Sequence, residues 1–259
     1  MGSTLYLSLY YLKRYRALAI SHINSPLLKA HAHDIVPFLE LDRDFWMKDN
    51  QSPNAEAIPR LLSTHISYQS LPLSIKTSSS KIVYISRNPM DQFISDWHFL
   101  PKFNGDEDAK PNSFQESFDR YCRGIHGYGP FWDHVLGFWK ESLERPKKVL
   151  FLKYEDLKTD PVMNIKRLAE FLGFPFTEEE EKKGLIEEIL AFCSIGRIRN
   201  LEVNKSGKSP NGVPHSALFR KGEIGDSNNF LTPAMVEKME KLMSEKYGDH
   251  MNLTFKSSV

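Results

Sequence analysis

The chain has 259 residues, of which 41% are hydrophobic and 26% charged, and its formal net charge is +1. This length and composition suit one globular domain with a full hydrophobic core, and the near-zero charge argues against a nucleic-acid partner and against electrostatic attachment to a membrane. No run of about 18 apolar residues occurs, so a membrane-spanning helix is not expected.

The N-terminal region, residues 1–24, carries no targeting signal that we can identify. It begins M-G-S-T-L-Y-L-S-L-Y-Y-L, which is apolar but has neither the basic stretch nor the small-residue cleavage site of a secretory signal. The two cysteines, Cys122 and Cys193, lie far apart in helix-like patterns. They favour buried, reduced thiols over a disulfide framework or a metal site. Both features predict a cytoplasmic protein.

Strand-like runs come next along the chain. Residues 61–65 form a weak strand pattern, whereas 81–86 (K-I-V-Y-I-S) and 149–153 (V-L-F-L-K) are rich in β-branched and aromatic residues. The two stronger runs are nearly continuous in apolar residues. Such runs are typical of a parallel sheet that is buried on both faces.

Helical patterns follow the two stronger strands. Asn88 is a typical N-cap residue with a proline after it, and further helices are predicted over 160–173 and 233–247. Thr177, with Glu180 three residues later, forms a capping-box pattern that opens another helix. Repeated strand-then-helix units predict an α/β fold with a doubly wound parallel sheet.

Residues 205–214 (K-S-G-K-S-P-N-G-V-P) are predicted to form a mobile loop. The Gly-Lys-Ser triplet at 207–209 suggests a nucleotide-binding P-loop, but that motif requires a first glycine at position 202, where the chain has Glu202. The flanking pattern is also helix then loop rather than strand then helix. A P-loop at this place is therefore not predicted.

Two basic elements are candidates for an anion site. Arg87 directly follows the strand 81–86, at the point where a helix begins with unpaired N–H groups and a positive dipole end. Ser95 lies eight residues after Arg87 and could add a hydroxyl to an anion lying along the helix. The second element is Arg220-Lys221-Gly222. Taken alone, each element is equally compatible with structural or solvated cations.

Taken together, these elements resemble the cytosolic sulfotransferases, most closely the plant members. The segment R-N-P-M-D-Q-F-I-S (87–95) matches one family motif. The segment R-K-G-E-I-G-D-S-N-N-F-L-T (220–232) matches the family signature R-K-G-x-x-G-D-W-x-N-x-x-T except for Ser227 at the tryptophan. The resemblance implies that the 3′-phosphate of the sulfate donor, 3′-phosphoadenosine 5′-phosphosulfate (PAPS), contacts Arg87, Ser95, Arg220, Lys221 and Gly222.

Two further segments extend the resemblance. L-S-T-H-I (62–66) corresponds to the segment that bears the family's catalytic histidine, which assigns His65 as the base that deprotonates the acceptor. An imidazole with an ordinary pKa of about 6.5 suits that role near neutral pH. L-K-Y-E-D-L-K (152–158) corresponds to the segment whose tyrosine contacts the adenine, here Tyr154.

The resemblance runs from about residue 25 to the C-terminus and implies a single sulfotransferase domain over 1–259. The implied fold is a three-layer α/β structure, a parallel sheet flanked by helices as in P-loop NTPases, incomplete at its N-terminus. The implied activity is sulfation of a hydroxyl group on a small acceptor such as a flavonol, a steroid or another plant metabolite. No metal, nucleic acid or membrane is implied, and a homodimer stays open.

The N-terminal donor loop of the family, P-K-[ST]-G-T-T-W-L-K, has no counterpart here. Leu12-Lys13 fall under its last two residues, but L-Y-L-S-L-Y-Y stands in place of the rest. Residues 5–12 therefore substitute as a strand, or the chain is a truncated or misassembled gene product. Ile195, where an aromatic often encloses the adenine, is a smaller departure. Two hypotheses remain: an active sulfotransferase, and a non-catalytic nucleotide-binding pseudoenzyme.

Overall fold

The structure is a computed structural model that describes residues 28–40, 61–103, 113–209 and 212–248. The chain divides into two compact units. We call residues 67–160 with 220–259 the sheet unit, and residues 1–66 with 161–219 the helical unit. A single domain over the whole chain stays a prediction, and each unit is described by itself.

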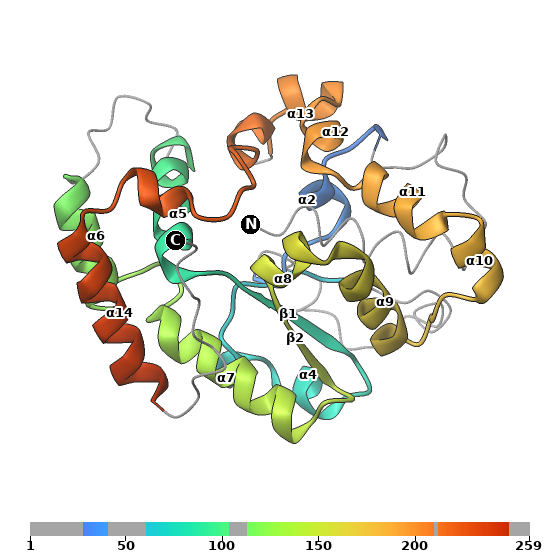
Figure 1. The fold of residues 1–259 in the computed structure, drawn as a ribbon, viewed down its shortest axis with the longest axis horizontal. Helices are drawn as coiled ribbons and strands as arrows, with labels where there is room; N and C mark the ends of the chain where they lie inside the picture. The colour runs from blue at the N-terminus through green and yellow to red at the C-terminus, as the bar shows by residue number, and fades with distance from the viewer. Residues whose placement is uncertain (1–27, 41–60, 104–112, 210–211, 249–259) are drawn as a thin grey trace. The chain divides into compact units, whose positions relative to one another are not determined.

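Two parallel strands form the centre of the sheet unit. Strand β1 (Ile82–Ser86) pairs with β2 (Val149–Lys153) in a register that runs from Ile82 opposite Val149 to Ser86 opposite Lys153. Both strands were predicted from their apolar runs, and the parallel sheet of an α/β fold is confirmed. Helix α7 (Phe131–Glu144) lies alongside the strands in Figure 1, and the ring of its Phe138 stacks on Tyr84 of β1 at 4.2 Å.

The remaining helices of the sheet unit pack around this centre. They are η3 (Tyr68–Ser70), α4 (Leu73–Thr77), α5 (Pro89–Phe103), α6 (Phe114–Cys122), α8 (Tyr154–Thr159), η5 (Asp226–Asn229) and α14 (Pro233–Tyr247). Helix α14 has the predicted bounds. Thr232 accepts a hydrogen bond from the backbone N–H of Met235, which caps the helix, and its buried residues recur every four positions from Met235 to Tyr247.

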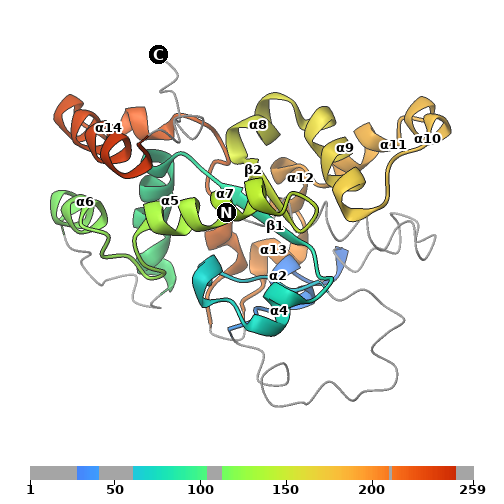
Figure 2. The same ribbon diagram turned by 90° about the horizontal axis from the view of Figure 1, so that it is seen from below.

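The helical unit contains α2 (Ala32–Ile35), α9 (Pro161–Leu172), α10 (Glu178–Lys182), α11 (Leu185–Phe192), α12 (Ile195–Arg199), α13 (Glu202–Ser206) and η4 (His215–Leu218). Figure 2 shows α9, α10 and α11 gathered together. Helix α9 starts at the predicted proline. The predicted capping box of α10 is confirmed, since Thr177 accepts from the N–H of Glu180 and the Glu180 carboxylate accepts from that of Thr177.

Two predictions about secondary structure were wrong. Residues 61–65 form no strand but a single parallel bridge between Phe38 and Ser63, in which Ser63 N–H bonds to the Pro37 carbonyl. The ladder cannot extend further back, because Pro37 has no N–H to donate. The loop predicted over 205–214 begins later than expected, since residues 205–206 belong to the last turn of α13, and within the loop Lys208 pairs with Pro214.

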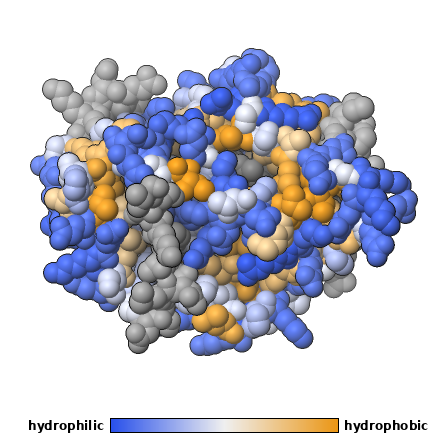
Figure 3. Space-filling view, in the orientation of Figure 1, coloured by the Kyte–Doolittle hydropathy of each residue, from blue (hydrophilic) through white to orange (hydrophobic). Residues whose placement is uncertain are grey.

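Cys122 and Cys193 are both buried and free, as predicted. Within the described ranges, no helix combines the length and the apolar character that crossing a membrane requires. On the face seen in Figure 3, hydrophobic residues form small patches that are separated by hydrophilic ones. Isolated apolar residues of this kind are normal on a protein surface.

Candidate functional site

The end of β1 and the start of α5 form the corner where the sequence placed an anion. Arg87 follows β1, and the Asn88 side chain accepts a hydrogen bond from the N–H of Met90 at 2.9 Å, which caps α5 as predicted. The Asn88 N–H in turn donates to the Glu155 carboxylate at the start of α8, also at 2.9 Å. The corner is therefore tied to the end of the neighbouring strand β2.

Arg87 is a buried cation rather than a solvated one, since only 6% of it is exposed. Its Nη2 donates to the Glu223 carbonyl oxygen at 2.8 Å, and its guanidinium lies 4.8 Å from the centre of the Tyr154 ring. The Tyr154 hydroxyl donates to the Gly222 carbonyl oxygen at 2.7 Å. Burial raises the pKa of Tyr154, which keeps this hydroxyl a donor. Two contacts thus join the corner to the segment after residue 220.

One face of α5 carries the rest of the corner. Asp91 lies four residues after Arg87, with 4.0 Å between the Asp91 carboxylate and the guanidinium, and only 1% of Asp91 is exposed. It accepts hydrogen bonds from the N–H groups of Gly225 at 2.7 Å and Ser227 at 2.8 Å. Ser95, four residues further, lies on the same face of the helix and is half-buried. This face is therefore the one that meets the segment 220–229.

Asp226 gathers the other two predicted cations. Its carboxylate lies 2.5 Å from Nη1 of Arg220 and 2.5 Å from Nζ of Lys221, and it also accepts from the Asn229 amide. Burial by itself would raise the pKa of Asp226, but these donors outweigh it and lower the pKa to about 2. Asp226 is therefore an internal anion that holds both cations in the ligand-free protein.

The structure brings most of the predicted site together. The sheet unit contains all six residues assigned to the nucleotide. Direct contacts link Arg87, Tyr154 and Gly222, while Arg220 and Lys221 share Asp226. Gly222 has a φ of +69°, a left-handed conformation that favours glycine, so the motif needs this residue for its turn.

His65 belongs to the helical unit, where 48% of its side chain is exposed. Its ring stacks on Phe38 at 5.0 Å with an angle of 11° between the planes. The Glu40 carboxylate accepts a hydrogen bond from the backbone N–H of His65 at 2.5 Å, and the same oxygen lies 3.4 Å from Nδ1 of the ring. The predicted base thus sits beside a carboxylate and an aromatic ring.

Sequence reasoning missed three acidic residues of these sites. Asp91 had a usable signal, because Arg87, Asp91 and Ser95 recur at the four-residue spacing of one helix face. Asp226 lies inside the signature but was not assigned a role. Glu40 had no local signal, because its contact with His65 spans 25 residues.

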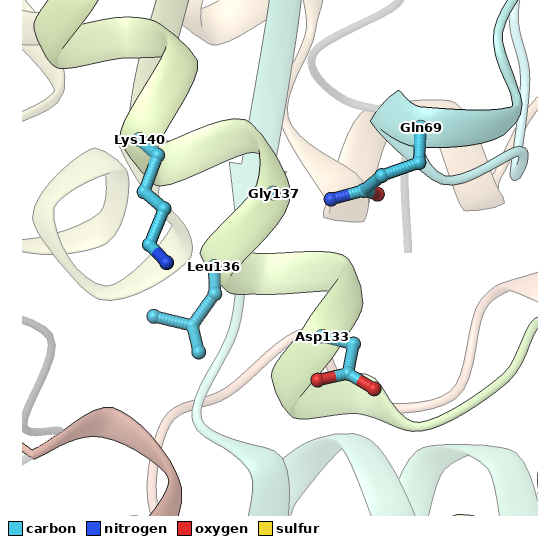
Figure 4. A pocket seen from close by; sticks show the side chains of 5 residues that line it. All are labelled: Gln69, Asp133, Leu136, Gly137 and Lys140. Atoms are coloured by element: carbon cyan, nitrogen blue, oxygen red, sulfur yellow. The ribbon is translucent and has the colours of Figure 1, made fainter.

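One hollow lies elsewhere in the sheet unit, beside α7. It is lined by Gln69, Asp133, Leu136, Gly137 and Lys140, and Figure 4 shows Gln69 pointing toward the helix at Gly137. None of the predicted site residues lines it. Among the described residues, no group of three or more His, Cys, Asp or Glu side chains is arranged to hold a metal ion. The N-terminal segment that replaces the donor loop lies outside the described residues.

Comparison with known proteins identifies relatives over almost the whole chain. The family model "Sulfotransferase domain" matches residues 2–251. Cytosolic sulfotransferase 15 of Arabidopsis thaliana is 46% identical over 238 residues, which cover 92% of this chain and 66% of the relative. Flavonol 3-sulfotransferase of Flaveria bidentis is 46% identical over 228 residues, which cover 86% of this chain and 72% of the relative. The chain thus spans about two thirds of the length of these relatives.

Solved structures agree with these matches. The structure of an Arabidopsis thaliana sulphotransferase, provisionally named a steroid sulphotransferase, has a TM-score of 0.70 and 33% identity, and the match covers 99% of this chain and 75% of that one. Mouse sulfotransferase SULT7A1 complexed with PAP has a TM-score of 0.61 and 29% identity, with coverage of 74% and 68%. Both are sulfotransferases of the same α/β fold.

Proposed function

Because the chain belongs to the sulfotransferase family, we propose that it binds PAPS and transfers the sulfuryl group to a hydroxyl group of a small acceptor. Arg87, Ser95 and the 220–222 segment hold the 3′-phosphate, and Tyr154 contacts the adenine. His65 takes the proton of the acceptor hydroxyl. The relatives named cytosolic sulfotransferases support a cytoplasmic location. A homodimer, and the absence of a metal, a nucleic acid or a membrane partner, stay predictions.

The proposal rests on three cations, Arg87, Arg220 and Lys221, whose two segments are joined by a hydrogen bond although they lie more than 130 residues apart in the sequence. Arg87 reaches the segment after residue 220 through hydrogen bonding, and that segment itself carries Arg220 and Lys221. Phosphate accepts charge-assisted hydrogen bonds from guanidinium and ammonium groups, and the start of α5 adds helix N–H groups and a positive dipole end. A 3′-phosphate offers the charge and the acceptors that these cations can bind.

The acceptor is proposed from the relatives alone. A relative is named for a flavonol and a structural neighbour for a steroid. We therefore propose a flavonol, a steroid or another hydroxylated plant metabolite as the acceptor. A panel of these compounds, tested with PAPS, separates the classes by which product carries the sulfate.

Binding of the reaction product 3′-phosphoadenosine 5′-phosphate (PAP) tests the phosphate corner independently of turnover. PAP that binds only the folded state raises the melting temperature with its concentration, and a hundredfold excess over Kd corresponds to about 2.7 kcal/mol. Arg87→Ala should abolish most of this shift. Arg120→Ala, which removes an exposed arginine of α6, is the matched control. A wild-type protein that shows no shift at saturating PAP would contradict the proposal.

The second candidate is a nucleotide-binding pseudoenzyme. It is favoured by the sequence L-Y-L-S-L-Y-Y at positions 5–11, which lacks the lysine and glycine of the family's donor loop. Loss of a single donor to developing charge costs roughly a hundredfold to a thousandfold in rate. A chimera that carries P-K-T-G-T-T-W-L-K in place of residues 5–13 distinguishes the two. Turnover only in the chimera supports the pseudoenzyme, whereas turnover in the natural chain supports the enzyme.

A further inference from the structure

The contact between Glu40 and His65 is more than a chance surface pair. One carboxylate oxygen of Glu40 receives the backbone N–H of His65 at 2.5 Å and also lies 3.4 Å from Nδ1 of the ring. The exposed fraction of the Glu40 side chain is 20%. Its second oxygen is buried with no hydrogen-bond partner among the described residues. Burying a carboxylate oxygen without a hydrogen-bond partner costs free energy, so the position of the Glu40 side chain calls for an explanation.

The backbone holds Glu40 and His65 in a defined register. Leu39 N–H bonds to the Ser63 carbonyl oxygen at 2.8 Å, and Ser63 N–H bonds to the Pro37 carbonyl oxygen at 2.9 Å. These two bonds place the segment ending at Glu40 beside the segment ending at His65. The Phe38 ring, stacked at 5.0 Å, covers one face of the imidazole. The ring of His65 is therefore restrained by its backbone, by Phe38 and by Glu40.

Among the described residues, His33 is a second titratable group near His65. Its ring contacts Phe38 edge-on at 5.0 Å. Burial, together with the nearby histidines, lowers the pKa of His33 to about 3, so this ring is neutral near pH 7. The charge that Glu40 presents to His65 is therefore not offset by His33.

From this geometry we infer that Glu40 is a positioning residue, which holds the proton of His65 on Nδ1 and leaves Nε2 as the nitrogen that accepts the acceptor's proton. The inference rests on the proposed role of His65 as the base. A neutral imidazole has one N–H and one lone pair, and a carboxylate beside Nδ1 selects the tautomer with its proton there. The same carboxylate stabilises the imidazolium that forms during the reaction.

The transfer step needs no further group to accept the proton or the electron pair. The acceptor oxygen forms a bond to sulfur, and its proton moves to Nε2 of His65. The bond between sulfur and the donor's 5′-phosphate oxygen breaks, and its electron pair stays on that oxygen. The Nδ1 proton stays in place, because Glu40 orients the ring and is not itself protonated.

The tautomer of His65 can be measured directly by NMR, whether or not the chain turns over. Histidine-selective ¹⁵N labelling of the full chain gives distinct shifts for protonated and unprotonated ring nitrogens. His65→Gln assigns the His65 signals among the 9 histidines. We expect Nδ1 of wild-type His65 to be protonated at a pH where the ring is neutral. Wild-type His65 with its proton on Nε2 would overturn the inference.

Two variants of Glu40 distinguish its role in orienting the His65 ring from the effect of its charge on that ring. Glu40→Ala removes the acceptor, so the majority tautomer should change to Nε2–H. Glu40→Gln keeps an oxygen for both N–H groups and should keep the fold and the Nδ1–H tautomer, but we expect it to lower the pKa of His65 measurably, by up to about one unit. If Glu40→Ala does not fold, Glu40→Gln decides: an unchanged His65 pKa overturns the inference.

Asp34→Asn is the matched control, since Asp34 is a carboxylate of the same unit that lies 3.7 Å from Nε2 of another histidine, His215. It should leave the His65 signals unchanged. In a protein that turns over, Glu40→Ala should lower kcat about tenfold or more with little change in the acceptor KM. An unchanged tautomer in Glu40→Ala refutes the role of Glu40 alone. Turnover that survives in His65→Ala refutes the base assignment instead.

Discussion

Replacing Asp226 by asparagine should destabilise the ligand-free protein by about 2 kcal/mol at pH 7. The pKa of Asp226 falls from 3.8 to about 2 in the folded protein, because bonds from Lys221, Arg220 and Asn229 outweigh the effect of burial. Each pKa unit corresponds to about 1.4 kcal/mol, which gives the expected loss. Asparagine keeps the shape of the side chain but leaves two cations without their shared anion.

The sign of the pH dependence follows from the same pKa. A carboxyl group whose folded pKa is depressed contributes its full stabilisation above the unfolded value of 3.8 and loses it as the pH falls toward 2. The free-energy difference between wild type and Asp226→Asn should therefore be constant from pH 8 to about 5 and shrink only in stronger acid. Urea unfolding without nucleotide, at pH 7 and at pH 5, measures it.

Asp119→Asn provides the comparison for Asp226→Asn. Asp119 forms an ion pair with Lys238 at 2.7 Å, but the two side chains are 40% and 52% exposed. Solvent screens such pairs, so its loss should cost clearly less than the loss of Asp226. If Asp226→Asn costs no more than Asp119→Asn, the reasoning about a buried internal anion is refuted.

Three more outcomes are expected. Tyr154→Phe removes the hydrogen bond to the Gly222 carbonyl and should cost about 1 kcal/mol in urea unfolding, with a smaller PAP-induced thermal shift. Gly207→Ala should lower the free energy of unfolding by about 1–3 kcal/mol, because its Cβ would press against a backbone carbonyl of α13; Gly196→Ala, where nothing lies within 4 Å, should not. Burial and the nearby His215 lower the pKa of His31 from 6.5 to about 4, so the unfolded state binds more protons between these values. His31 by itself should lower the stability by about 2 kcal/mol from pH 7 to pH 5, in addition to the loss from His33, whose pKa is lowered to about 3. His31→Gln should therefore reduce the total loss by about 2 kcal/mol, and a variant that loses as much stability as the wild type would contradict the assignment.

Local patterns in the sequence were sufficient for the two strands and for several of the helices. The apolar runs of β1 and β2, the proline and N-cap at the start of α5, and the capping box of α10 each depend on residues within a few positions of one another. The helix caps can be predicted because the atoms that satisfy the backbone are close in sequence, whereas the apolar runs of β1 and β2 predict buried strands but not their pairing. The motifs at 87–95 and 220–232 are also local, and through the family resemblance they predicted the corner where we propose that the nucleotide binds.

The contacts that complete each site were decided by the tertiary structure. Residues 61–65 read as a strand, yet they form a single bridge: Pro37 has no N–H to extend the ladder backward, and in the forward direction the His65 N–H bonds to the Glu40 carboxylate. Glu40 reaches His65 across 25 residues, and Arg87 reaches Glu223 across 136. A buried charge needs a partner of opposite charge or a hydrogen-bonding group. The sequence does not show which distant residue will be that partner, because this depends on how the helices and strands pack.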